Sequence, residues 1–268
     1  YASWRFVETP FRRQKMRPLV GRGMLGTAAI LIFVVSLGGH VSKGYPDRMP
    51  KEVGAILAIE NAFGENYKRC LAVRKSVASM DLNDTCVLGA QAPPKIALWG
   101  DSHAAALFDA LADGLTNEGL STKAFLVSSC LPVPNLLNFG QKRTDQCADF
   151  NSRVLAKIKA DSSLEVVVLL ATWDNYFLSE STPDMFGRRG TDGFYAYPYD
   201  ASPNMPENQR RLGVENAVQQ LLVSLVEAGK KVVIVNSVPR PDVNIPRYTA
   251  FQVLKGNGFP TDLSYERS

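Results

Sequence analysis

Residues 93–268 alternate short apolar runs with stretches of helical periodicity. Residues 95–100 (KIALWG), 122–127 and 165–171 (EVVVLLA) are short and apolar, a pattern typical of buried strands. The run EVVVLLA has the continuous β-branched character of a parallel strand that is covered on both faces. Residues 230–238 (KKVVIVNSV) predict a fourth strand.

Helical patterns separate these predicted strands. After the first strand, apolar side chains recur at helical spacing, at Ala105, Leu107, Phe108, Leu111 and Leu115. Further helices are predicted near residues 150–160 and over residues 207–228. This alternation predicts an α/β fold, a doubly wound parallel sheet between helical layers, with ligands beyond the carboxyl ends of the strands. Residues 174–206, rich in Gly, Pro, Tyr and Asp, are predicted to be an insertion or lid after the third strand.

An uncharged run of 20 residues lies between Arg22 and Lys43. A helix of this length spans about 30 Å, the thickness of the hydrocarbon core of a bilayer. A buried helix or a signal peptide is the alternative, but the long basic flank and the lack of a clear cleavage site favour a transmembrane helix over residues 19–40. Basic flanks stay in the cytoplasm, so the residues after His40 are predicted to lie outside it.

Charge is concentrated in the first residues of the chain. Residues 1–22 carry six basic side chains and one glutamate, so the formal net charge of +4 leaves −1 for the remainder. This distribution gives no support to a nucleic-acid partner. Hydrophobic residues make up 46% and charged residues 21%, which excludes a disordered or collagen-like chain. The chain begins at Tyr1 and stops at Ser268 without an obvious final element, so we expect it to be a piece of a longer protein.

The four cysteines fall into two local pairs, Cys70 with Cys86 and Cys130 with Cys147. In an oxidising compartment such pairs form disulfides that close short loops, each contributing about 3 kcal/mol. Four reduced, buried cysteines are the alternative. Neither the cysteine spacing nor the two histidines match a metal site, so none is expected.

Gly100-Asp101-Ser102-His103 stands where the first predicted strand turns into a helix. A serine at such a turn presents its hydroxyl to the site, and nearby helix N-terminal amides are suited to stabilise an oxyanion. Asp and Ser also cap helices without any chemistry. The position at the end of the first strand favours the chemical interpretation, with Asp101 and Ser102 as catalytic candidates.

These blocks resemble the SGNH/GDSL hydrolase superfamily, and more specifically the periplasmic SGNH domain fused to bacterial acyltransferase-3 (AT3) membrane proteins. IALWGDSHAAAL has the GDSH form of that subgroup, and YASWRFVETPFRR looks like the end of an AT3 membrane domain. CLPVPN with a downstream cysteine and VPRPDVNIPR are similar to the subgroup as well. The resemblance implies a three-layer α/β/α, flavodoxin-like fold. Residues 1–18 would then be the tail of the membrane domain, 41–92 a periplasmic extension, and 93–268 an SGNH-like domain that is incomplete at its C-terminus.

The resemblance also implies a function. It predicts an O-acyltransferase, in the first instance an O-acetyltransferase, of the bacterial inner membrane that modifies an extracytoplasmic glycan such as a cell-surface polysaccharide. An AT3 domain in cis would deliver acyl groups from a donor such as acetyl-CoA, and this part would bind no cofactor. Ser102 would be the nucleophile that relays the acyl group. A membrane-anchored glycan acyl esterase and a non-catalytic glycan-binding module remain alternatives.

The base of the triad is the main departure from the family. The family uses a His in an Asp-x-x-His block, and the histidines of this chain, His40 and His103, do not form one. On a helix the side chain of His103 projects away from that of Ser102, so His103 is expected to have an orienting or helix-capping role. We expect the block to follow Ser268.

Other candidates lie in the segments that follow the second, third and fourth predicted strands. Asn175 is predicted to donate to an oxyanion and Trp173 to stack on a sugar, in a block where the superfamily has Gly-x-Asn-Asp. The candidates for substrate binding are Ser129, in a block (residues 127–130) where the usual glycine of the superfamily is not evident, Tyr195 and Tyr197 in the stretch GFYAYPYD, and Arg247, which is predicted to close the cleft. Each has a structural alternative: a local turn for Asn175, packing for the aromatic residues and solvent exposure for Arg247.

Overall fold

The computed structural model describes most of the chain and divides it into two compact units, residues 1–58 and 59–268. The described residues are 4–5, 18–45, 48–60, 62–71, 77–138, 145–178, 196–199, 201, 205–237, 241 and 243–260. Most of the predicted AT3 tail and Tyr195 therefore lie outside the described residues.

One long helix dominates the described part of the first unit. α2 (Pro18–Val41) covers the uncharged run, and most of its large apolar side chains from Leu25 onward are exposed. The helix ends where the amide of Gly44 donates to the carbonyl of Gly39 at 2.8 Å. No helix within the described ranges is both long and apolar enough to cross a membrane. The membrane-spanning role of residues 19–40 stays a prediction. α3 (Lys51–Ile59) follows.

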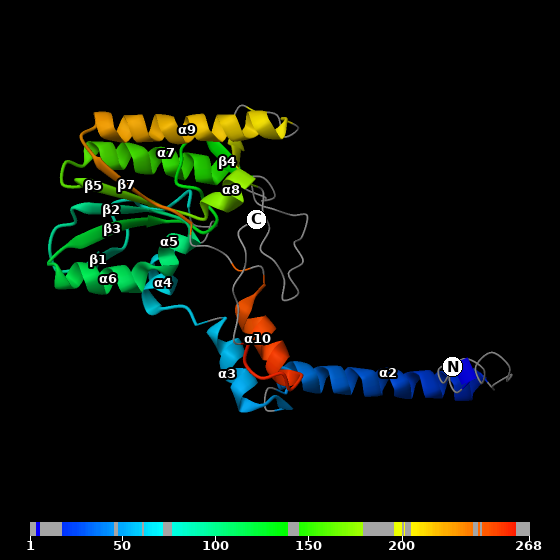
Figure 1. Ribbon diagram of the computed structural model, residues 1–268. Helices are drawn as coiled ribbons and strands as arrows, with labels where there is room; N and C mark the ends of the chain where they lie inside the picture. The colour runs from blue at the N-terminus through cyan, green and yellow to red at the C-terminus, as the bar shows by residue number, and fades with distance from the viewer. Residues whose placement is uncertain are drawn as a thin grey trace. The chain divides into compact units, whose positions relative to one another are not determined.

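A five-stranded sheet forms the centre of the second unit (Figure 1). Its order is β1-β3-β2-β5-β7, and all neighbouring strands are parallel except β1, which is antiparallel to β3 at one edge. The strands are β1 (Val87–Gly89), β2 (Ile96–Gly100), β3 (Ser121–Leu126), β5 (Val166–Leu170) and β7 (Lys231–Val235). The predicted mixed α/β fold with a mostly parallel sheet is confirmed, whereas β1 was not predicted.

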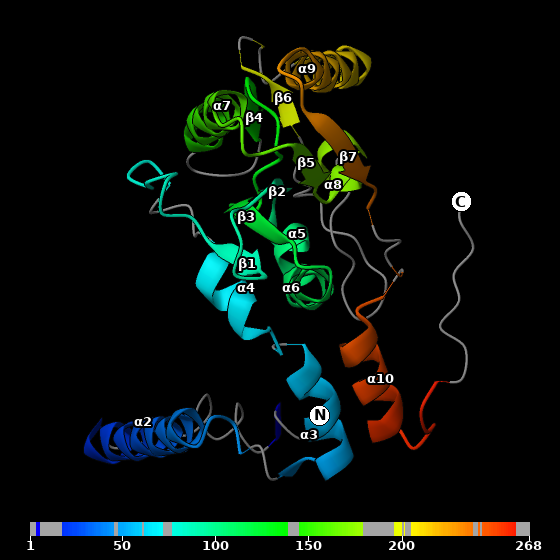
Figure 2. The ribbon, with the colours of Figure 1, turned by 90° about the vertical axis from the view of Figure 1, so that its left-hand side faces the viewer.

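Helices cover both faces of this sheet (Figures 1 and 2). On one face lie α5 (Ser102–Ala106) and α6 (Phe108–Asn117), with α4 (Glu65–Cys70) beside them. On the other face lie α7 (Asp145–Ala160) and α9 (Glu207–Glu227). The single helix predicted after the first strand is in fact divided at Leu107.

The strand order places a topological switch at β2. From β2 the chain reaches β3 through α5 and α6 on one face, and from β3 it returns past β2 to β5 through α7 on the other face. In such sheets ligands bind outside the carboxyl ends of the two strands at the switch. The residues that follow Gly100 of β2 and Leu170 of β5 are therefore expected to form the site.

Successive side chains of β2 enter two separate cores. Trp99 is fully buried in the core beneath α7 and α9, whereas Leu98 joins the core beneath α5 and α6. The indole Nε1 of Trp99 donates to Oδ1 of Asn151 on α7 at 3.0 Å. The side-chain Nδ2 of Asn151 in turn donates to the carbonyls of Leu131 (2.6 Å) and Val133 (3.0 Å). This buried polar bridge fixes α7 and the loop after β3 against the strand that carries the site.

Two disulfides join elements of the second unit. Cys70–Cys86 links α4 to the segment before β1, and Cys130–Cys147 links the loop after β3 to the first turn of α7. The predicted pairing is confirmed, and the alternative of four reduced cysteines is wrong.

Several short elements were not predicted. β4 (Leu136–Asn138) pairs antiparallel with β6 (Ala196–Pro198), and α8 (Trp173–Leu178) follows β5 directly. α10 (Ile245–Leu254) comes after β7. α8 and β6 flank residues 179–195 of the predicted insertion, which lie outside the described residues.

Candidate active site

Ser102 is the first residue of α5 and comes just after the carboxyl end of β2. The turn depends on Gly100, because a Cβ there would collide with the carbonyl oxygen of Leu170 and lie 2.6 Å from Cβ of Ala104. Asp101 has extended backbone (φ −101°, ψ −158°) and caps α5. The half-buried Ser102 therefore sits at the switch between β2 and β5, at a strand-to-helix turn.

Asp101 joins the two strand ends through a fully hydrogen-bonded carboxylate. Its side chain is 1% exposed. Oδ1 accepts from the amide of His103 at 2.8 Å. Oδ2 accepts from the amide and the hydroxyl of Thr172, each at 3.1 Å, and from the hydroxyl of Tyr176 at 3.2 Å. We call this set of four residues the Asp101 clamp, because it ties the serine turn to the segment that follows β5.

The clamp changes the expected oxyanion donors. The amide of His103, one of the helix N-terminal amides expected to face an oxyanion, is instead bonded to Asp101. Asp101 itself caps the helix, and the predicted orienting role of the His103 side chain stays a prediction. Thr172 and Tyr176 were missed in the sequence, where no local pattern links them to Asp101.

The segment after β5 separates the two candidates predicted there. Trp173 is 8% exposed, belongs to the core beneath α7 and α9, and donates its indole N–H to the carbonyl of Val235 at 2.8 Å. This burial favours packing over sugar stacking. Asn175 lies on α8 between Thr172 and Tyr176, and its Oδ1 is buried without a hydrogen-bond partner among the described residues. This buried oxygen next to the clamp is suited to accept a hydrogen bond from a ligand hydroxyl. Donation from the Asn175 side-chain NH₂ group to an oxyanion stays a prediction.

The loop after β3 reaches the same edge of the sheet. The amide of Val127 donates to the carbonyl of Gly100 at 3.2 Å, which ties this loop to the serine turn. Ser129, two residues on, has φ of +53°, the left-handed conformation that glycine adopts most readily. A glycine would adopt this conformation with less strain than serine does. Its role in binding substrate stays a prediction.

Tyr67 of α4 approaches the clamp from another direction. Burial, and then the negative charge of Asp101, raise the pKa of the Tyr67 phenol. Its ring stacks on Phe63 with centroids 4.4 Å apart, and it packs against the core that contains Ala104 and Phe108. Tyr67 was not predicted as part of the site, because tertiary packing and the Cys70–Cys86 disulfide, rather than a local pattern, bring α4 beside α5.

Arg210 is a second buried polar centre, 3% exposed, in the first turn of α9. Its guanidinium donates to the carbonyls of Tyr176 (3.0 Å) and Phe177 (2.6 Å) on α8 and of Ala196 (2.7 Å) on β6. Glu207 pairs with the same guanidinium at 2.6 Å. Arg210 therefore holds the described residues on both sides of residues 179–195 and fixes the helix that supplies Tyr176 to the clamp.

The remaining candidates are not brought to Ser102 by any described contact. Tyr197 is 8% exposed on β6, which favours packing. Nε of Arg247 on α10 lies 2.9 Å from Oε1 of Glu60. The cleft-closing role of Arg247 stays a prediction.

Comparison with known proteins identifies a family that matches most of this chain. The model of a family described as the SGNH domain fused to AT3 domains matches residues 69–267. The search of curated proteins finds no match. Among solved structures, the periplasmic domain of a lipopolysaccharide acetyltransferase from Salmonella ser. Paratyphi A is similar, with 18% identity and a TM-score of 0.45. The alignment covers 72% of this chain and 65% of that one, so the chain spans less than two thirds of its length.

Proposed function

Because this chain belongs to the family of SGNH domains that are fused to AT3 domains, we propose that it is the extracytoplasmic part of an O-acyltransferase that modifies a glycan. The proposed acyl group is acetyl, and the proposed acceptor is a cell-surface polysaccharide. The observation that carries the proposal is the placement of Ser102 at the β2–β5 switch, on a turn that a buried carboxylate holds in place.

The proposed cellular setting combines three features. Two disulfides favour an oxidising, extracytoplasmic compartment. The uncharged run between Arg22 and Lys43 supports an anchor in the bacterial inner membrane, with the basic flank in the cytoplasm. An AT3 domain in cis would bring acetyl groups across the bilayer from a thioester donor such as acetyl-CoA.

The proposed chemistry has two steps. In the first, Oγ of Ser102 attacks the acyl carbonyl carbon, its proton passes to a base, and the bond from that carbon to the donor breaks as the donor takes up a proton. In the second, a sugar hydroxyl attacks the acyl-serine ester, gives its proton to the base, and Ser102 leaves and regains its proton. The amide of Asn175 is the proposed donor to the oxyanion of both steps.

The base is the part of the triad that this proposal takes from the family. Neither His40 nor His103 stands three residues after an Asp, and the His103 side chain is adjacent to the nucleophile on the same short helix. The proposal therefore assigns proton transfer to the His of an Asp-x-x-His block outside residues 1–268.

The test is glycan acylation by the full-length protein in its membrane. Ser102→Ala should abolish the alkali-labile acetate on the surface polysaccharide, measured by mass spectrometry, at unchanged protein level. Ser163→Ala, an exposed serine before β5 at the opposite edge of the sheet, is the matched control and should retain acylation. Undiminished acylation by Ser102→Ala would remove the nucleophile assignment. Net loss of acetate from an acetylated glycan, with no transfer to an acceptor, would identify an esterase instead.

A further inference from the structure

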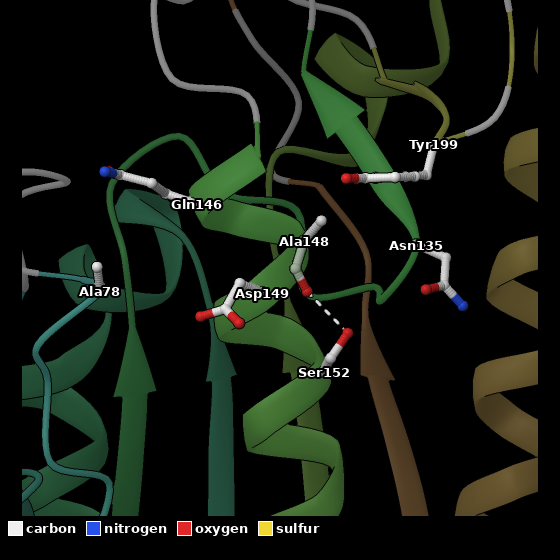
Figure 3. A pocket seen from close by; sticks show the side chains of 7 residues that line it. All are labelled: Ala78, Asn135, Gln146, Ala148, Asp149, Ser152 and Tyr199. Atoms are coloured by element: carbon white, nitrogen blue, oxygen red, sulfur yellow. Dashed lines mark hydrogen bonds between the residues drawn. The ribbon is translucent and has the colours of Figure 1, made fainter.

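Two neighbouring cavities lie along α7. They have volumes of about 570 and 580 Å³ and share Asn135 and Ser152. Figure 3 shows the first cavity, in which side chains of α7 lie between Ala78 on one side and Asn135 with Tyr199 on the other. The second cavity continues along the same helix past Leu155 to Lys159 and Ala160. We call the two together the α7 groove.

Both walls of the α7 groove are fixed in place. The guanidinium of Arg153 on α7 donates to the carbonyls of Val77 (2.7 Å) and Met80 (3.0 Å), which holds the turn that carries Ala78. On the other side, the amide of Tyr199 donates to the carbonyl of Asn135 at 3.0 Å, next to the paired strands β4 and β6. The groove is therefore preformed, so little of the free energy of ligand binding is lost in ordering the protein.

The lining combines an exposed ring, uncharged polar groups and an apolar floor. Tyr199 is 59% exposed, and its side chain extends toward α7 (Figure 3). Asn135, Gln146 and Ser152 add amides and a hydroxyl, and Asp149 adds a carboxylate. Toward Lys159 the lining becomes apolar, with Pro134, Leu155 and Ala156. A sugar fits this mixture, because it carries both hydroxyl groups and apolar C–H faces. Side-chain amides and carboxylates form hydrogen bonds with the hydroxyl groups, and aromatic rings pack on the C–H faces.

The charge of the lining argues against the other common polymers. Among the described residues that line the two cavities, Asp149 and Lys159 carry a charge, and Asp149 is paired with Arg153 at 3.0 Å. A nucleic acid or another polyanion needs several unpaired cations along its path. The described part of the lining is thus suited to a neutral chain.

The α7 groove also begins at the edge of the sheet that carries Ser102. The Cys130–Cys147 disulfide ties the first turn of α7 to the loop after β3, at the carboxyl edge. From Gln146 to Ala160 the helix rises about 21 Å, long enough for several sugar units. We propose that the α7 groove binds a neutral oligosaccharide segment of the acceptor glycan, away from the unit that receives the acyl group. This proposal rests on the proposed function, since it requires a polymeric acceptor.

Binding is tested first, on the full-length protein with Ser102→Ala, so that no turnover occurs. The probe is the surface polysaccharide of the source bacterium, freed of O-acyl groups by alkali, cut to a few repeating units and titrated by calorimetry. Tyr199→Ala should weaken binding roughly threefold to tenfold, whereas Tyr199→Phe keeps the ring and should retain most of the affinity. Phe259→Ala is the matched control, because its ring is 62% exposed and does not line the groove.

A second variant tests the far end of the groove without removing any contact. Ala156→Trp places a large ring at an exposed position of α7 within the second cavity and should also weaken binding. Unchanged affinity in both Tyr199→Ala and Ala156→Trp, or no binding by the Ser102→Ala parent, would overturn the proposal. Acylation assays with Ser102 present distinguish the proposed function from the proposed binding in the α7 groove. Glycan binding through the groove without acylation contradicts the proposed function alone. Acylation with an unchanged KM for the glycan in both Tyr199→Ala and Ala156→Trp contradicts the groove alone.

Discussion

The Asp101 clamp makes a quantitative prediction about stability. Asp101→Ala removes the acceptor of four hydrogen bonds in a side chain that is 1% exposed. The hydroxyls of Thr172 and Tyr176 can turn toward other acceptors, but the amides of His103 and Thr172 are fixed by the backbone. Each buried donor left unpaired costs about 1–3 kcal/mol. We therefore expect a loss of about 2–5 kcal/mol in the free energy of unfolding.

Asp101→Asn is the sharper variant, because it keeps the shape of the side chain. It retains one acceptor oxygen, but the new NH₂ group opposes a donor wherever it replaces an oxygen of the carboxylate. A role limited to filling space would leave this variant as stable as the parent. A role as the clamp predicts a loss of about 1–3 kcal/mol.

The assay is thermal and urea unfolding of the chain with its disulfides intact, followed by circular dichroism. For a unit of this size, each kcal/mol lowers Tm by about 2–4 °C, so a loss of about 2–5 kcal/mol in Asp101→Ala should lower Tm by roughly 4–20 °C. Asp113→Ala, which removes an exposed carboxylate from α6, is the control and should change stability by less than about 0.5 kcal/mol. A Tm for Asp101→Asn within error of the parent would refute the clamp.

Two further predictions concern the surroundings of the site. Replacing Cys130 and Cys147 together by alanine opens the disulfide that holds the loop of Ser129, and should lower the urea midpoint by the equivalent of about 3 kcal/mol; an unchanged midpoint without reductant would contradict this. Hydrogen bonding from Arg210 lowers the pKa of Glu207. The stability from this pair is therefore fully present well above pH 4.5, the ordinary pKa of glutamate, and is lost as the pH falls through the lowered value. Glu207→Gln should flatten the acid side of a stability–pH curve, and an unaltered acid slope would show that the pair does not contribute.

The central strands β2, β3 and β5 were predictable because they are short, mostly apolar and largely buried on both faces. Residues 165–171 carry that signal locally, and β5 forms there. The position of Ser102 followed from the same logic, because a GDS block after a predicted strand has a defined place in a doubly wound sheet. The disulfides were predictable for a similar reason, since each joins cysteines only 16 or 17 residues apart.

The contacts that organise the site are instead distant in the sequence. Asp101 meets Thr172 across 71 residues and Tyr176 across 75, and neither partner carries a local pattern that announces it. β4 and β6 are three residues each, too short for a periodic signal, and pair across the chain. Trp173 shows how this limits functional prediction. An aromatic residue in a loop after a strand is equally compatible with sugar stacking and with packing, and only the hydrogen bond to Val235 reveals which. Tyr199 comes from the same tyrosine-rich stretch as the buried Tyr197, but its ring stays exposed beside α7. The fold therefore decides which tyrosine of this stretch is the better candidate for binding a sugar.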